Sequence, residues 1–264
     1  MPTSTLTAGV TTGPLPADDL GTTVDVTAPA RRVVSLVPSL TEAITATRRD
    51  ALAGATDWCT HPADLDVPRV RGTKNPDRAA IAELAPDLVV ANQEENRELD
   101  VERLRASGID VWVTRIRTVD EAFSSMRRLF EAALGWGVPT WLEEAEQVWS
   151  AEPGRAGPRV AVPIWRDPWM VVGSDTFTGD VVARLGWQNV FADSDDRYPR
   201  LELGEIDRDD VDLVLLPDEP YVFGPEDGPE AFTHAPTALV SGRTLTWYGP
   251  SLVTARAELE ALVV

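Results

Sequence analysis

The sequence predicts an α/β protein of two Rossmann-like lobes with parallel sheets, because the same arrangement of elements occurs twice along 264 residues. In the first half, the apolar run at 33–37 is followed by a proline and a helical stretch. In the second half, the apolar run from Arg159 leads to a Gly/Ser/Asp/Thr turn that opens another helix. Each half then contains a second apolar run, at 86–92 and 211–217. Strands that alternate with helices are typical of parallel sheets, and such paired lobes bind ligands between their strand-to-helix loops.

The predicted elements of the first lobe follow from periodicity and from capping residues. Apolar residues recur at helical spacing from Leu40 to Thr47, so a helix is predicted at 40–49. Gly108 is expected to end a further helix at 96–107, because glycine is common just after a helix. The other predicted elements are an edge strand at 24–26 and strands near 51–55, 87–91 and 110–114, with a helix at 77–84.

Two helices are predicted to join the lobes. Thr118 and Glu121 form a T-x-x-E capping box for a helix at 118–134. Pro139 suits the first turn of the next helix, whose apolar residues share one face. A helical connection is stiff, so little hinge motion is expected. The predicted bounds are a polar, disordered leader at 1–16, an N-terminal lobe at 17–118, bridging helices at 119–157 and a C-terminal lobe at 158–264.

Composition excludes several classes of protein and site. The net charge of −19 argues against nucleic acid or an anionic membrane surface as partner, because both would repel the chain. One cysteine and two histidines argue against a disulfide and against a zinc or manganese receptor. No apolar run approaches the roughly 18 residues that span a bilayer. Without a signal segment or lipid-acceptor cysteine near its start, the sequence as written predicts a cytoplasmic protein, or an extracytoplasmic one if a signal was removed.

Aromatic residues in loops are the candidate ligand contacts. The chain has nine tryptophans. Several lie in segments rich in proline, glycine and aspartate, together with one tyrosine: Trp58, Trp165, Trp169, Trp247 and Tyr248. Large flat side chains suit a macrocyclic or aryl ligand through stacking. The alternative, that a given ring only closes the edge of a lobe, stays open.

Several motifs in register resemble one family. They are DDLGTTVDV at 18–26, RRVVSLVPSLTE at 31–42, RGTKNPD at 71–77, LAPDLVVANQEEN at 84–96, RYP at 197–199 and LTWYGP at 245–250. Together they resemble the helical-backbone metal-receptor family (class III periplasmic binding proteins), which bind cobalamin, haem or ferric siderophores for ABC importers. The resemblance implies two α/β lobes joined by a rigid helix, with no catalytic residues, no metal site and no intrinsic cofactor.

The resemblance also implies the binding residues. Carried over to this sequence, the ligand contacts are Asp57, Trp58, Lys74, Trp165, Arg166, Trp169, Tyr198, Trp247 and Tyr248. Members of the family dock to their permease through an acidic residue on each lobe. Those positions fall at Ala79 and Gly204, with Glu205 adjacent, so productive docking to an ABC permease is not expected.

Other interpretations remain open. An enzyme or metal-processing protein on the same fold is the alternative function, although no nucleophile–base motif supports it. Cys59 and His61 could hold a metal axially, against the interpretation as a buried thiol and a loop histidine. The acidic residues at 94–98 and 193–196 could form a rim for a basic partner, or could simply be solvated.

Overall fold

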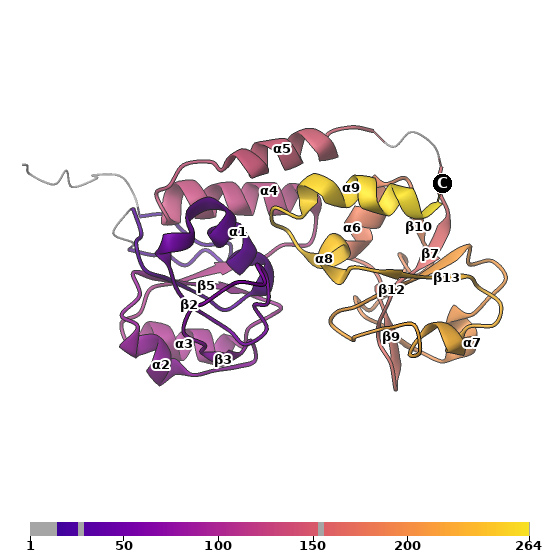
Figure 1. Ribbon diagram of the computed structural model, residues 1–264, viewed down its shortest axis with the longest axis horizontal. Helices are drawn as coiled ribbons and strands as arrows, with labels where there is room; N and C mark the ends of the chain where they lie inside the picture. Colours follow the sequence, from indigo (N-terminus) through magenta and orange to yellow (C-terminus); the bar gives the residue numbers. More distant parts are fainter. Residues whose placement is uncertain (1–14, 26–28, 153–155, 264) are drawn as a thin grey trace, which may run out of the picture.

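The computed structural model describes residues 15–25, 29–152 and 156–263. Residues 15 and 16 excepted, the predicted leader lies outside this range. Two α/β lobes lie next to each other, and helices connect them along one side of the molecule (Figure 1). No helix in the described residues is long and apolar enough to cross a membrane.

The N-terminal lobe contains a parallel sheet in the strand order β2-β1-β5-β6. All strand residues but one are buried, as in parallel sheets that are covered on both faces. The strands are β1 (Val33–Ser35), β2 (Leu52–Ala55), β5 (Leu88–Asn92) and β6 (Val111–Thr114). At the predicted edge strand 24–26, the described residues Val24 and Asp25 are not in a strand, and nearby Ala17 and Thr23 form only an isolated bridge.

Helices connect these strands near the predicted positions. Pro38 begins α1 (Pro38–Arg48), where proline is tolerated because the first amides of a helix lack partners. The Asp77 carboxylate caps the next helix by accepting from the amides of Ala79 and Ala80. The other elements of this lobe are the 3₁₀ turn η1 (Arg49–Ala51), the hairpin β3 (Arg71–Gly72) and β4 (Asn75–Pro76), α2 (Arg78–Glu83) and α3 (Glu98–Ala106).

The C-terminal lobe repeats this topology. Its parallel sheet has the order β10-β7-β12-β13, in which the first and third strands along the chain are again central neighbours. The strands are β7 (Arg159–Ala161), β10 (Gln188–Asn189), β12 (Leu213–Pro217) and β13 (Thr237–Val240). The fold is therefore the predicted pair of α/β lobes with parallel sheets.

One part of this lobe differs from the prediction. The long apolar run after Arg159 continues beyond β7 into an antiparallel hairpin, to which a third strand is added. These strands are β8 (Pro163–Trp165), β9 (Trp169–Val171) and β11 (Arg200–Leu201). The helices are α6 (Phe177–Arg184), α7 (Leu203–Ile206), α8 (Gly242–Thr246) and α9 (Leu252–Glu260), with 3₁₀ turns η3 (Pro229–Ala231) and η4 (Ala261–Val263).

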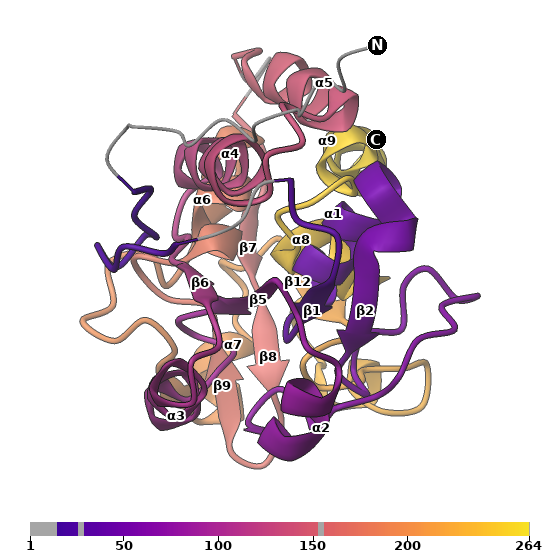
Figure 2. The same cartoon turned by 90° about the vertical axis from the view of Figure 1, so that its left-hand side faces the viewer.

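Two antiparallel helical segments bridge the lobes rather than one long helix. The first, α4 (Val119–Arg128), starts against the C-terminal lobe, where the Val119 amide donates to Asp180 of α6 (2.8 Å). It continues into the π-helical turn η2 (Leu129–Ala133). The second segment, α5 (Thr140–Trp149), makes the last crossing and is tied to α4 by the Arg127–Glu146 ion pair. Both side views place α5 on the edge of the molecule away from the sheets (Figures 1 and 2).

A single apolar core runs through both lobes and the bridging helices. Its buried members include residues of α1, α4, α5, α6 and α9: Ile44, Met126, Leu142, Val181 and Leu252. Two smaller clusters cover the other face of each sheet. Because the largest cluster is shared, the lobes cannot separate without exposing apolar side chains to water.

Trp149 tests how much this shared core contributes. Its ring is 2% exposed and its indole N–H donates to the Leu252 carbonyl of α9 (2.8 Å). We expect Trp149→Phe to lower the free energy of unfolding by roughly 2–4 kcal/mol, because it opens a cavity and removes a buried hydrogen bond between α5 and α9. Urea unfolding measures this. The control Trp165→Phe, at a residue 45% exposed, should change stability by less than about 0.5 kcal/mol. Equal losses in both variants would contradict a shared core.

Candidate functional site

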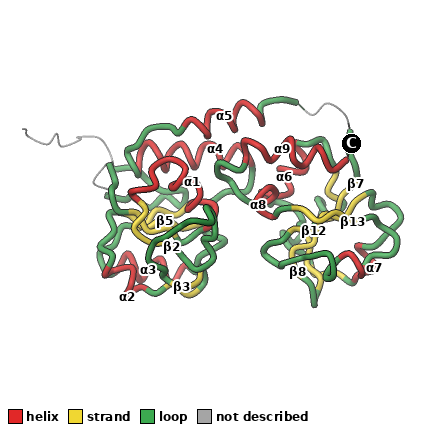
Figure 3. Tube along the Cα trace, viewed as in Figure 1, coloured by secondary structure: helices red, strands yellow, loops and turns green. Residues whose placement is uncertain are grey.

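The loops at the carboxyl ends of the parallel strands face each other across the lobe boundary. In each sheet, the central pair of strands is where the strand order reverses, and ligands of such sheets bind at that point. In the N-terminal lobe the segments that follow this pair are the start of α1 and the turn after β5. In the C-terminal lobe, the segment after β12 corresponds to the turn after β5. Figure 3 shows loops, in green, on the facing sides of the two lobes.

Polar contacts tie the two N-terminal segments to the other lobe, through the loop before β11 and through α8. Glu94, after β5, accepts a hydrogen bond from the Tyr198 hydroxyl (3.0 Å) and pairs with Arg197 (2.5 Å). Glu42, in the first turns of α1, accepts from Arg243 Nε of α8 (2.7 Å). The side chains of both lobes therefore form one polar boundary.

Two of the predicted aromatic contacts are exposed. Trp58 is 67% exposed in the loop after β2, with its indole against the Gly72 backbone. Trp165 is 45% exposed at the end of β8, where it makes an edge contact with Tyr221 (centroids 5.6 Å apart). The two rings come from opposite lobes and remain free to stack on another molecule.

The three other predicted aromatic contacts are buried. Trp169 stacks on Phe223 at 5.9 Å inside the C-terminal lobe. Trp247 makes an edge contact with His61 of the other lobe at 5.3 Å, and Tyr248 packs on Phe177. Their exposed fractions are 8%, 5% and 7%. These rings therefore contribute to packing, and ligand contact through them stays a prediction.

The polar residues predicted for the site have varied surroundings. Asp57 and Lys74 are exposed, and the Lys74 ammonium donates to the Glu94 carbonyl. Arg166 is engaged within its own lobe by Asp227 and Glu230 and lies over the Trp169 ring.

Tyr198, the remaining predicted residue, donates a hydrogen bond from its hydroxyl to the Glu94 carboxylate of the other lobe. Burial raises the pKa of Tyr198 above its ordinary value, and the Glu94 charge adds to this, so the phenol stays protonated and donates.

Acidic residues of the boundary have perturbed pKa values. Burial raises the pKa of Glu219 to about 7, and the charge of the adjacent Asp218 adds to this effect. Desolvation also raises the pKa of Glu95, and the positive charge of Lys74 partly offsets this increase. The Glu95 side chain itself is exposed to solvent.

Three residues of the boundary are not predicted by the sequence: Glu42, Glu219 and Arg243. A signal for Glu219 exists, since Asp218 and Glu219 follow β12 as Glu94 and Glu95 follow the equivalent strand β5. The pairing of Glu42 with Arg243 has no such signal, because the two residues are 201 positions apart.

No group of three or more residues suited to hold a metal ion occurs in the described parts of the chain. The Cys59 thiol is fully buried and hydrogen-bonded to the hydroxyls of Thr41 and Thr56. Burial raises its pKa. It therefore has the environment of a structural thiol and not of a metal ligand.

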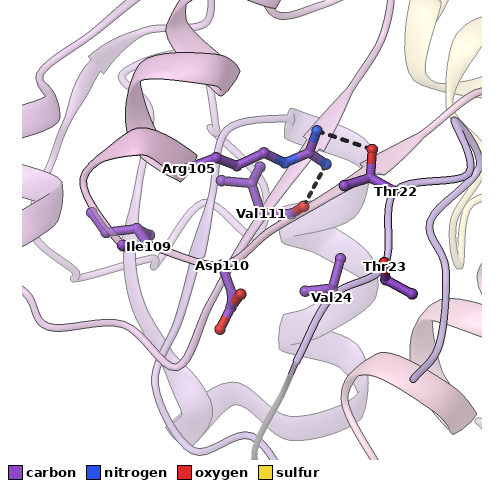
Figure 4. A pocket seen from close by; sticks show the side chains of 8 residues that line it. Thr22, Thr23, Val24, Arg105, Ile109, Asp110 and Val111 are labelled. Atoms are coloured by element: carbon purple, nitrogen blue, oxygen red, sulfur yellow. Dashed lines mark hydrogen bonds between the residues drawn. The ribbon is translucent and has the colours of Figure 1, made fainter. Parts of the chain in front are cut away.

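Two open cavities lie elsewhere. One, of about 300 Å³, is lined by residues near the start of β6, at the sheet edge opposite the site (Figure 4). There Arg105 donates to the Thr22 hydroxyl and to the Val111 carbonyl, so its guanidinium is engaged in hydrogen bonds within the protein and not directed at a ligand. The other, of about 320 Å³, lies beside Arg48 and Trp136.

Curated proteins that are similar in sequence share one name. No family model matches the chain. A vitamin B12-binding protein of Pectobacterium carotovorum is 24% identical over 202 residues, 72% of each chain. One from Salmonella typhi is 27% identical over 188 residues, which cover 67% of this chain and 68% of the relative.

Solved structures share the fold. The periplasmic vitamin B12 binding protein BtuF of Vibrio cholerae superposes with a TM-score of 0.68 at 18% identity, over 89% of this chain and 97% of that one. The periplasmic heme-binding protein RhuT from Roseiflexus sp. RS-1 gives 0.71 at 19% identity, over 88% and 97%. The resemblance to class III periplasmic binding proteins is confirmed. The relatives are binding proteins.

Glu219 provides a test of the site's electrostatics. Its folded pKa of about 7 lies above the ordinary value of 4.5, so between these pH values the folded state keeps a proton that the unfolded chain has lost. The free energy of unfolding must then fall as pH rises through this window. Glu219→Gln removes that dependence, so its stability relative to wild type should rise by at most about 3 kcal/mol from pH 4 to pH 8.

Urea unfolding at several pH values measures this difference. Glu226→Gln, at an exposed position of the same lobe, is the control and should show no such trend. A constant difference between Glu219→Gln and wild type across the window would mean that Glu219 titrates normally.

Proposed function

We propose that the protein is a non-catalytic binding protein for a metal chelate of the cobalamin, haem or ferric-siderophore class, with no intrinsic cofactor. The ligand would lie between the lobes, against the loops at the carboxyl ends of the strands. Relatives named as vitamin B12-binding proteins support this ligand class.

The observation that carries the proposal is the exposure of two tryptophans from different lobes, Trp58 in the loop after β2 and Trp165 at the end of β8. An exposed tryptophan leaves a large apolar surface in water, and such surfaces mark binding sites. Two rings from opposite lobes can stack on the faces or edges of one large flat chelate. The shared core keeps the lobes in place, so the ligand meets a preorganised site and loses little affinity to reordering.

The alternative of an enzyme lacks a supporting constellation. Cys59 is buried with a raised pKa, and His61 packs on Trp247 with its Nδ1 near the Thr60 hydroxyl (3.2 Å) but forms no ion pair with a described carboxylate. Neither arrangement activates a nucleophile by an adjacent base.

Docking to a permease is proposed to be absent or weak. The two expected positions lie on exposed residues, Ala79 of α2 and Gly204 of α7. Both helices are at the end of the molecule away from the bridging helices (Figure 1). Glu205 uses its carboxylate to accept from the Glu202 amide (2.8 Å), which reduces its availability for a partner. Solved relatives are periplasmic proteins, and fractionation of the native host decides between the cytoplasm and that compartment for this chain.

A titration tests the binding function. Purified protein is mixed with cyanocobalamin, haem and ferrioxamine B, and tryptophan quenching and visible absorption are recorded. We expect saturable binding of at least one ligand at micromolar concentration. Trp58→Ala and Trp165→Ala should each weaken it by about 1–3 kcal/mol, the range for stacking on an aromatic side chain.

The matched control is Trp136→Phe, at a half-buried tryptophan on the bridging side of the molecule, which should leave affinity unchanged. Absence of binding to all three ligands would contradict the proposed function. Normal affinity in both alanine variants would contradict the assigned site.

A further inference from the structure

Equivalent strands of the two lobes each end in a pair of acidic residues. Glu94 and Glu95 follow β5 after one residue, Gln93, and Asp218 and Glu219 directly follow β12. The two strands occupy the same place in sheets of the same order. The two acidic pairs are close enough for the Glu95 charge to contribute to the raised pKa of Glu219.

Part of this charge is neutralised by ion pairs. Glu94 is paired with Arg197, and Glu42 with Arg243. Neither Glu95 nor Glu219 forms an ion pair within the described part of the chain. The cation that acts most strongly on Glu95 is Lys74. Glu219 is only partly ionised at neutral pH, so the excess negative charge of the boundary comes mainly from Glu95 there and grows as pH rises above about 7.

A second observation points to a missing partner at the same place. The Tyr248 side chain is only 7% exposed, yet its hydroxyl makes no hydrogen bond of normal geometry to a described residue, and Ser39 and Thr114 act on it only as weak hydrogen-bond partners. Ser39 and Thr114 of the N-terminal lobe lie near it, and the charges of Glu94 and Glu95 reach it. Glu42 Oε2 is likewise buried and unpaired. Buried polar groups normally have partners, so these two atoms can gain one only from a ligand group that displaces the side chains covering them.

We propose that the inter-lobe site selects cationic chelates, or neutral chelates with an amide periphery, and rejects anionic ones. This inference rests on the proposed binding function. Unpaired carboxylates in a partly enclosed space repel a ligand carboxylate more strongly as the ligand displaces water. The Tyr248 hydroxyl, which stays protonated, donates to a ligand carbonyl.

A series of cyanocobalamins with unchanged cobalt ligands isolates ligand charge. Cyanocobalamin is neutral, its monocarboxylic acid is anionic, and the aminoethylamide of that acid is cationic. Isothermal titration should give affinities in the order cationic, neutral, anionic, with about tenfold between neighbours at low salt and less at high salt. Ferrioxamine B and its neutral N-acetyl derivative provide the same comparison for a siderophore.

Charge variants of the protein locate the effect. Glu95→Gln and Glu219→Gln should each reduce the preference for the cationic ligand several-fold. Glu144→Gln, on the exposed face of α5, changes the net charge by the same amount and should preserve the preference. Equal affinities across the charge series, or a preference that survives both site variants, would overturn the proposal.

Tyr248→Phe separates binding from folding. Because the hydroxyl is unpaired without ligand, its removal should leave urea stability unchanged or slightly higher, while affinity for cyanocobalamin or ferrioxamine B falls several-fold. Unchanged affinity would show that the hydroxyl does not meet the ligand. If neither ligand class binds wild-type protein, the binding function itself is wrong; if they bind without regard to charge, only the selectivity is wrong.

Discussion

The shared apolar core is the constraint on which the rest of the structure depends. It passes from α1 through the bridging helices α4 and α5 into α6 and α9, with residues such as Phe130 and Trp149 almost fully removed from water. Each square ångström of apolar surface that separation of the lobes would expose costs about 25 cal/mol, so opening this core is unfavourable. The strand ends of the two lobes are therefore held opposite each other whether or not a ligand is present, and the site is built before binding.

The sequence predicted the repeated fold because that fold depends on local signals. Apolar runs followed by helical periodicity identify parallel strands, and these appear at β1, β5 and β12 as expected. The hairpin β8–β9 was missed because a continuous apolar run does not show where the chain reverses. The predicted site was less complete, since exposure of an aromatic ring in a loop is decided by tertiary contacts. Trp58 and Trp247 have similar local sequences, yet only Trp247 meets a ring of the other lobe.

The acidic residues of the boundary are maintained against a folding penalty. Burial makes the ionised form of Glu219 unfavourable, and the Glu219 side chain needs the absence of a Cβ at Gly242, where such an atom would lie 2.2 Å from Glu219 Cγ. A neutral residue would remove the electrostatic part of this penalty. Features that reduce stability without helping packing are characteristic of functional sites, where binding offsets them.

Contacts between the lobes are thus of two kinds, and they differ in how easily they change. The apolar contacts of α5 with α9 are extensive and fixed. The ion pair of Glu94 with Arg197 is about one third exposed on both sides, and pairs of that exposure contribute only about 0–1 kcal/mol. A ligand can therefore replace such polar contacts with its own at little energetic loss while the core holds both lobes in place. Under the proposed function, adaptation to different chelates falls to side chains such as Glu94, Arg197 and Tyr198, and not to a hinge between the lobes.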